Sequence, residues 1–189
     1  QIVEALEGLV YKSFENVEPT NKKYYLALDV SGSMDSPISE SGQITCAQAT
    51  AIMAMTIARS EKNYIIKGFS SVLKDLDITA NTSIRDAFNI TSYQNFGATD
   101  CALPMIDALK NNIYVDAFVI LTDSETWYGS IHPVQALKQY QNAINKDAKL
   151  IVVAMTATGF SIAEPNNPNM LDVVGFDTST PAVISEFIR

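Results

Sequence analysis

Two patterns of apolar residues follow one another along this chain: continuous apolar runs and stretches with helical spacing. Nearly continuous apolar runs at residues 23–30, 64–69, 117–121 and 149–155 are typical of parallel strands that are buried on both faces of a sheet. Between these runs, apolar residues recur at helical spacing or small residues surround the whole helix. These stretches predict helices at residues 2–14, 44–59, 84–90, 100–110, 133–145 and 182–188. We place Asp100 as the N-cap of its helix and Pro104 in the first turn of that helix.

The alternation of strands and helices predicts a doubly wound, Rossmann-like α/β fold, with helices on both faces of a mostly parallel sheet. The short, charged stretch at residues 72–77 is typical of an antiparallel edge strand. A last short strand is expected at residues 173–176, after a polar loop at 166–169. We assign residues 21–189 to this domain, and residues 1–20 to a helix and a junction that precede it.

Composition and charge narrow the range of functions. The 189 residues suit one domain, and the net charge of −8 disfavours nucleic-acid binding over the surface as a whole. Cys46 and Cys101 are too few for a disulfide framework, so we expect buried thiols in a reducing compartment. We therefore expect a cytoplasmic protein, with the nucleus as a second location. No apolar run is long enough to cross a bilayer, so no membrane partner is expected.

Short oxygen-bearing side chains gather in segments that the predicted topology brings to one edge of the sheet. Asp29, Ser31 and Ser33 directly follow the first strand. Thr99 precedes a predicted helix, and Asp123 follows the clearest central strand. Ligands of doubly wound sheets bind beyond the carboxyl ends of the strands, so these side chains should meet there. Hydroxyl and carboxylate oxygens suit a hard divalent cation, whereas zinc and copper would need a His or Cys cluster that the sequence lacks.

The same residues resemble the metal-ion-dependent adhesion site of the von Willebrand factor type A family, which has the pattern Asp-x-Ser-x-Ser, then a Thr, then an Asp. The resemblance implies the von Willebrand A fold and a site for Mg²⁺, or another divalent cation such as Mn²⁺ or Ca²⁺. Ser31, Ser33 and Thr99 would approach the cation directly. Asp29 and Asp123 would bind it directly or through water. Neutral hydroxyls leave a cation underneutralised, so an open position would attract a carboxylate from an acidic protein ligand.

Longer segments resemble the carboxy-terminal domain of the Ro ribonucleoprotein autoantigen family over nearly the whole chain. This resemblance implies a parent protein in which a ring of helical repeats binds small noncoding Y RNAs and misfolded noncoding RNAs. The ring would adjoin residues 1–20 and carry most of the RNA contacts. One departure is Ala98, where the family commonly has Gly. The matching segments include Val17-Glu18-Pro19-Thr20, Gly97-Ala98-Thr99-Asp100-Cys101, Thr122-Asp123-Ser124-Glu125-Thr126, His132-Pro133, Ala148-Lys149-Leu150-Ile151-Val152, Met155-Thr156 and Gly175-Phe176-Asp177-Thr178.

Three other functions stay open at this point. An enzyme would need a base beside Ser31 or Ser33, and we interpret His132, the one histidine, as a loop residue, so we expect no catalysis. An extracellular cell-adhesion domain would bind an acidic protein ligand through the same metal site. A purely structural cation would pin the loops together. For the binding function we expect Asp29→Ala and Asp123→Ala to abolish cation binding with little loss of fold, because the loops should lie outside the core.

Overall fold

The computed structural model describes residues 12, 18–39, 42, 44–92, 98–123, 128–157 and 162–189. The helix predicted at 2–14 falls almost entirely outside this part of the chain. The strands form one sheet in the order β3-β2-β1-β4-β5-β6, in which β2 and β3 pair antiparallel and the other neighbours pair parallel. The strands are β1 (Lys23–Asp29), β2 (Asn63–Phe69), β3 (Leu73–Asp75), β4 (Ala117–Thr122), β5 (Lys149–Ala154) and β6 (Met170–Val174).

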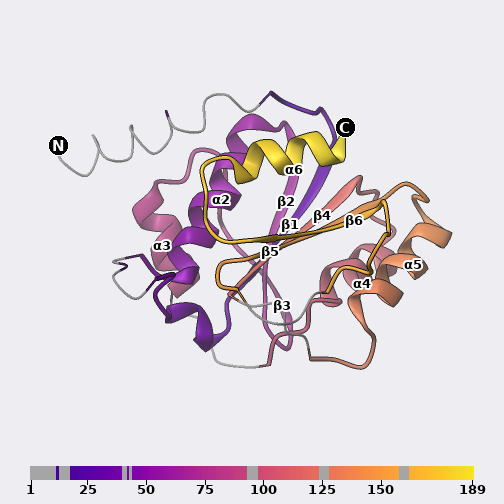
Figure 1. Cartoon of the computed structure of the whole chain (residues 1–189), viewed down its shortest axis with the longest axis horizontal. Coiled ribbons are helices and arrows are strands. Elements are labelled where there is room, and N and C mark those ends of the chain that lie inside the picture. Colours follow the sequence, from indigo (N-terminus) through magenta and orange to yellow (C-terminus); the bar gives the residue numbers. More distant parts are fainter. Residues whose placement is uncertain are drawn as a thin grey trace.

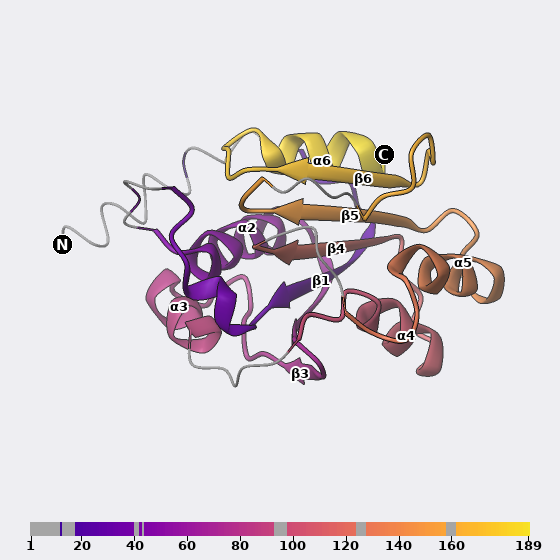
Figure 2. The ribbon, with the colours of Figure 1, turned by 60° about the horizontal axis from the view of Figure 1, so that its bottom comes forward.

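Helices cover both faces of the sheet (Figures 1 and 2). One core lies between the sheet and the helices α2 (Cys46–Ser60), α3 (Ile84–Ser92) and α6 (Thr180–Ile188). A second core lies on the opposite face, under α4 (Leu103–Lys110) and α5 (Pro133–Ala143). The predicted doubly wound α/β fold, with a mostly parallel sheet and one antiparallel edge strand, is therefore confirmed. Within the described residues, no helix has both the length and the apolar character needed to cross a bilayer.

Burial explains why the central elements are apolar nearly all round. Every residue of β4 is buried, because helices pack on both of its faces and strands flank both of its edges. Every residue of helix α2 from Cys46 to Ala58 except Gln48 is buried, since the helix contacts the sheet as well as α3 and α6. Thr45 and Gln48 begin this helix with a capping box, in which each side chain accepts a hydrogen bond from the other residue's backbone N–H.

Several boundaries differ from the predictions by a few residues, and the largest differences are at α4 and β6. Asp100 is not the N-cap of α4: the N-cap is Ala102, whose backbone N–H donates to Asp100 Oδ1 at 3.0 Å, so Asp100 closes the turn before the helix. The last strand begins at Met170 and not at 173, because Met170 pairs with Leu150 and extends the parallel ladder. It ends at Val174, before Gly175 adopts a φ of 97°. A local turn fixes the start of α4, whereas long-range pairing, which local pattern does not encode, fixes the start of β6.

Candidate metal site

The candidate site lies where the order of the strands reverses. From β1 the chain runs outward through β2 and β3 and then crosses back to β4, which pairs with the other edge of β1. Ligands bind at such switch points in open α/β sheets. Leu28 pairs with Leu121, so the next residues, Asp29 and Thr122, emerge side by side at the carboxyl ends of the two strands.

Asp29 is fully buried and holds three segments together. Its Oδ1 accepts the backbone N–H of Ser31 at 2.8 Å. Its Oδ2 accepts the Thr122 hydroxyl at 2.7 Å and lies 3.4 Å from the Thr99 hydroxyl, which also donates to it. Both carboxylate oxygens are thus fixed by donors from the loop after β1, the end of β4 and the loop before α4. This corrects the expectation that the site loops lie outside the core.

A short 3-10 helix, η1 (Gly32–Asp35), fixes the two serines of the site. The Ser31 and Ser33 hydroxyl oxygens are 3.0 Å apart. The backbone N–H of Met34 donates to the Ser31 carbonyl, and the Met34 side chain is only 1% exposed, so it anchors the turn in the core. Ser33 is exposed, so the hydroxyl pair reaches from the buried Asp29 toward the surface.

Backbone hydrogen bonds place the Thr99 and Asp123 loops. Thr99 is held on both sides, because Asp100 N donates to the Ser70 carbonyl at 2.9 Å and Tyr128 N donates to the Thr99 carbonyl at 2.7 Å. The Asp123 carbonyl accepts the N–H of Thr156 at 2.9 Å and its hydroxyl at 2.6 Å. The Asp123 carboxylate is therefore carried on a backbone that β5 supports, and its Oδ1 lies 3.4 Å from the Thr122 hydroxyl.

The two carboxylates of the site repel each other. Burial raises the pKa of Asp29, and the negative charge of Asp123 raises it further, while hydrogen bonds from Ser31 and Thr122 act in the opposite direction. Neither carboxylate has an ion-pair partner among residues 18–39, 98–123 or the other described segments. A divalent cation would supply the missing positive charge, so the observed set of oxygens fits a hard cation.

The two thiols flank this site from opposite cores, and neither is suited to bind metal. Burial raises the pKa of Cys46 to about 11, and the charges of Asp123 and Asp29 contribute to that rise. Burial also raises the pKa of Cys101, again with contributions from nearby carboxylates. Both cysteines are buried and neither is in a disulfide, as predicted. Protonated thiols are poor ligands, and in the described segments no three His, Cys, Asp or Glu residues gather as a metal cluster.

The predicted site residues converge, and the structure adds two features that the sequence did not reveal. Asp29, Ser31, Ser33 and Thr99 are linked by hydrogen bonds, and Thr122 joins Asp29 to Asp123. Thr122 was missed because its role depends on strand register, although its place directly before Asp123 could have suggested it. The second feature is the contact of Tyr128 and Gly129 with the Thr99 loop, which involves backbone and has no side-chain signal.

A doubly wound sheet of this order, with one antiparallel edge strand, defines the von Willebrand A class of domain. It is similar to manganese-loaded TRAP protein from Plasmodium vivax, with a TM-score of 0.57 over 89% of this chain and 74% of that one; at 15% identity the likeness shows the fold alone. Within this class, the family model described as the Ro60 vWA domain matches residues 23–188, and the chain belongs to that family.

Relatives support this assignment over the whole chain. The RNA-binding protein RO60 of Caenorhabditis elegans is 42% identical over 189 residues, which are 100% of this chain and 29% of that protein. The protein of the same name from Deinococcus radiodurans is 42% identical over 190 residues, or 36% of its length. The crystal structure of the Deinococcus radiodurans RO (RSR) protein matches 98% of this chain and 38% of that chain, with a TM-score of 0.88. The chain thus spans about a third of these relatives.

Proposed function

We propose that this chain is the non-catalytic, divalent-cation-dependent binding domain of a Ro-type ribonucleoprotein. One observation carries the proposal: the Asp29 and Asp123 carboxylates meet hydroxyl groups at the switch point, and their charge is not balanced by any ion pair among the described residues. Such an arrangement is costly unless a cation binds, because like charges in a poorly hydrated place repel strongly.

The cation would be bound directly by the hydroxyls of Ser31, Ser33 and Thr99. The carboxylates of Asp29 and Asp123 would bind it directly or through water. Mg²⁺ is the ion we favour, with Mn²⁺ or Ca²⁺ as other hard cations that accept the same oxygens. Because most of its ligands would be neutral hydroxyls, the bound cation would keep an open coordination position that a carboxylate of an acidic protein could fill. The shallow position of Ser33, which is exposed, gives such a partner access to the site.

The RNA functions of the parent protein are part of the same proposal. The relatives are named RNA-binding proteins, and this chain corresponds to about a third of their length. We assign Y RNA and misfolded noncoding RNA to a ring domain that would adjoin residues 1–20, in a protein of the cytoplasm and the nucleus. The two buried thiols, neither of which is in a disulfide, favour a reducing compartment over the surface of a cell.

The absence of catalysis is supported by the surroundings of the nucleophilic groups. His132 is the N-cap of α5, where its ring accepts the backbone N–H of Val134 at 3.2 Å, so it has a structural role at a helix end. Burial raises the pKa of both thiols and keeps them protonated. The Ser31 hydroxyl lies 3.0 Å from the Ser33 hydroxyl, and the one histidine of the sequence is at the start of α5.

The test is a pull-down from cytoplasmic extract with the immobilised chain, in Mg²⁺ and in chelator. Asp123→Ala is the site variant, and Asp147→Ala, which removes an exposed carboxylate from the other end of the sheet, is the matched control. We expect a protein that is retained only with Mg²⁺ and only by the wild-type and control chains. Retention that is equal in chelator, or equal for Asp123→Ala, would contradict the proposal.

A further inference from the structure

We propose that the end of the domain opposite the metal site is a contact surface for single-stranded RNA, formed by lysines around the exposed ring of Tyr114. This inference rests on the proposed ribonucleoprotein function, but it assigns an RNA contact to this domain itself and not only to the ring. We call this surface the basic end. It comprises the residues at the amino ends of the parallel strands and the carboxyl ends of the helices.

Charge is distributed unevenly between the two ends of the sheet. At the metal end, Asp29 is the last residue of β1, and the described loops at this end contain Asp35, Asp100, Asp123 and Asp177 but no Lys or Arg. At the basic end, cations precede the strands or end the helices, and they outnumber the carboxylates there. Phosphates would therefore be repelled by one end of this acidic chain and attracted by the other. The cations are Lys22, Lys23, Arg59, Lys62, Lys110, Lys146, Lys149 and Arg189, and the carboxylates are Glu18, Glu61, Asp116, Asp147 and Glu186.

Several of these charged side chains already interact with other residues of the domain. The Lys149 ammonium group donates to the Phe187 carbonyl and lies 4.8 Å from the centre of the Phe187 ring, so it completes the end of α6. Arg189 forms salt bridges with Glu18 and Glu186. By contrast, the ammonium groups of Lys22, Lys23, Lys62, Lys110 and Lys146 have no ion-pair partner in the part of the chain that is described.

Most carboxylates of the basic end already accept hydrogen bonds or form salt bridges within the fold, whereas most of its lysines have no ion-pair partner among the described residues. Asp116 Oδ2 accepts the backbone N–H of Lys23 at 2.8 Å, and its Oδ1 accepts the Tyr114 hydroxyl at 3.0 Å. Glu61 is buried and accepts donors from residues 20, 21 and 24. Asp147 is the exposed carboxylate that has no ion-pair partner within the described residues. The charge that faces solvent is therefore predominantly positive.

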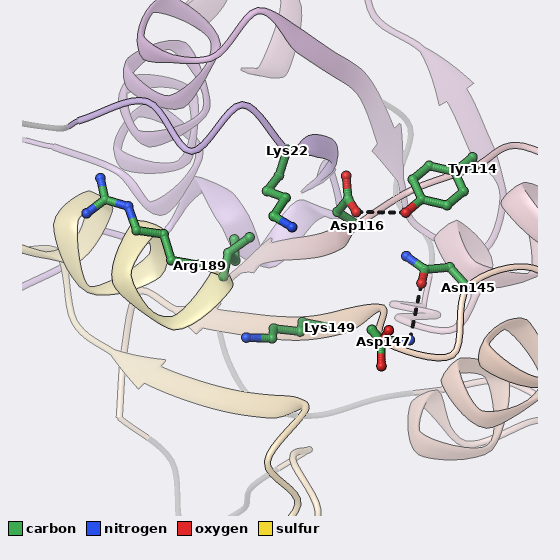
Figure 3. Close-up of a pocket in the computed structure, with 8 residues that line it drawn as sticks. Lys22, Tyr114, Asp116, Asn145, Asp147, Lys149 and Arg189 are labelled. Atoms are coloured by element: carbon green, nitrogen blue, oxygen red, sulfur yellow. Dashed lines mark hydrogen bonds between the residues drawn. The ribbon is translucent and has the colours of Figure 1, made fainter.

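A cavity of about 190 Å³ gives the surface its shape. Lys22, Lys149 and Arg189 contribute cations to its lining, and Tyr114 and Asn145 contribute polar groups. Figure 3 shows Lys22, Asp116 and Tyr114 next to one another along one side, with Asn145 and Asp147 below them. The cavity is thus a polar recess at the amino ends of β1, β4 and β5.

Tyr114 supplies the aromatic surface. Its side chain is 50% exposed, and the hydrogen bond from its hydroxyl to Asp116 fixes the orientation of the ring. Proteins that bind single strands without sequence preference combine exposed aromatic rings, on which bases stack, with cations that follow the backbone. The juxtaposition of Tyr114 with Lys22, and with Lys146 in the loop beside the cavity, matches this combination.

The experiment measures binding of a fluorescent oligouridine to the 189-residue chain at low salt by anisotropy. A Lys22→Ala, Lys146→Ala double variant should bind about tenfold more weakly, and its log K against log salt slope should be about 1.4 smaller, as expected for two lost phosphate contacts on a single strand. Tyr114→Ala should also lose about tenfold, whereas Tyr114→Phe, which keeps the ring, should stay close to wild type. The charge-matched control is Arg85→Ala, Lys138→Ala, with both residues exposed on other helices.

The outcomes separate this inference from the metal site. If the control binds normally, and Asp123→Ala and chelator have no effect, RNA binds at the basic end whether or not the metal site has a partner. Oligouridine that fails to bind at low salt overturns the inference, as do equal losses for the control and the Lys22, Lys146 variant. Binding that requires Mg²⁺ or Asp123 also overturns it, because RNA would then lie at the metal end. None of these RNA results depends on whether Mg²⁺ retains a protein in the pull-down.

Discussion

Two buried carboxylates at opposite ends of the sheet have contrasting surroundings. Asp29, 0% exposed, accepts hydrogen bonds but shares its site with the carboxylate of Asp123, and its pKa is raised by burial first and by that like charge as well. Glu61, 4% exposed, accepts the N–H and hydroxyl of Thr20 at 2.7 and 2.8 Å, the N–H of Asn21 at 3.2 Å and the hydroxyl of Tyr24 at 3.2 Å.

The difference shows what kind of burial indicates a binding site. The donors around Glu61 come from the segment that leads into β1, so the carboxylate is satisfied by the fold and clamps that segment to the end of α2. The donors around Asp29 do not balance the second negative charge beside it. A buried acid with protein donors alone is a structural feature, whereas a buried acid with an unbalanced like charge points to an absent positive group.

The largest expected effect is on cation affinity. Asp123→Ala should weaken Mg²⁺ or Mn²⁺ binding more than 100-fold in isothermal titration calorimetry, because about half of the anionic charge of the site is lost. Asp147→Ala, at the other end, should leave the dissociation constant unchanged. Equal affinities for the Asp123→Ala and wild-type chains would place the cation elsewhere.

At Asp29, the choice of substitution matters. Asp29→Asn should also abolish cation binding, with the thermal midpoint of the cation-free chain close to or above that of wild type, since it removes the repulsion from Asp123. Asp29→Ala should unfold at a lower temperature than Asp29→Asn, because the Ser31 N–H and Thr122 hydroxyl lose their buried partner. An equal midpoint for the two variants would contradict this account.

At the opposite end the effect should be on stability alone. Glu61→Ala should lower the free energy of unfolding by about 3 kcal/mol, because the backbone N–H groups of Thr20 and Asn21 lose their acceptor. Urea denaturation measures this loss. Cation affinity should be unchanged, and a large loss of affinity with intact stability would reverse the roles assigned to the two acids.

A further measurement tests how much the bound cation stabilises the folded chain. Mg²⁺ at about 100 times its dissociation constant should stabilise the wild-type chain by about 2.7 kcal/mol, which for a domain of this size raises the thermal midpoint by roughly 5–10 °C. Differential scanning calorimetry with and without chelator measures the shift, which Asp123→Ala should lack and Glu61→Ala should retain. A wild-type chain insensitive to cation would remove both the proposed site and the structural alternative.

The smallest expected effect concerns the backbone that supports Thr99. Gly129 has a φ of 142°, and a Cβ there would come within 2.6 Å of the Asp100 carboxyl group. Gly129→Ala should therefore displace this contact, with a loss of about 1–2 kcal/mol of stability and a several-fold loss of cation affinity. Gly175→Ala is the matched control, because its φ of 97° is also positive but its Cβ meets no atom within 4 Å. A control that weakens cation binding equally would exclude the steric explanation.

The sequence predicted those features that depend on local pattern. Continuous apolar runs placed the central strands β1, β4 and β5 correctly, because strands buried on both faces need such runs. Short polar residues after β1 and β4, together with Thr99 before α4, predicted one group that comprises Asp29, Ser31, Ser33, Thr99 and Asp123. What was missed depends on pairing between distant segments: the register that places Thr122 beside Asp29, the pairing that starts β6 at Met170, and the backbone contact between Tyr128 and Thr99.

The contacts of Glu18 have a consequence for the order of events during synthesis. Its carbonyl accepts the Ser185 hydroxyl at 3.1 Å and the Arg189 guanidinium at 3.0 Å, across sequence separations of 167 and 171 residues. A ribosome delivers α6 last, so the segment before β1 stays without these partners until almost all of the 189 residues have emerged. The domain therefore cannot complete its fold while its last helix is in the exit tunnel, and a nascent chain stalled before α6 is the stage at which protection by a chaperone matters most.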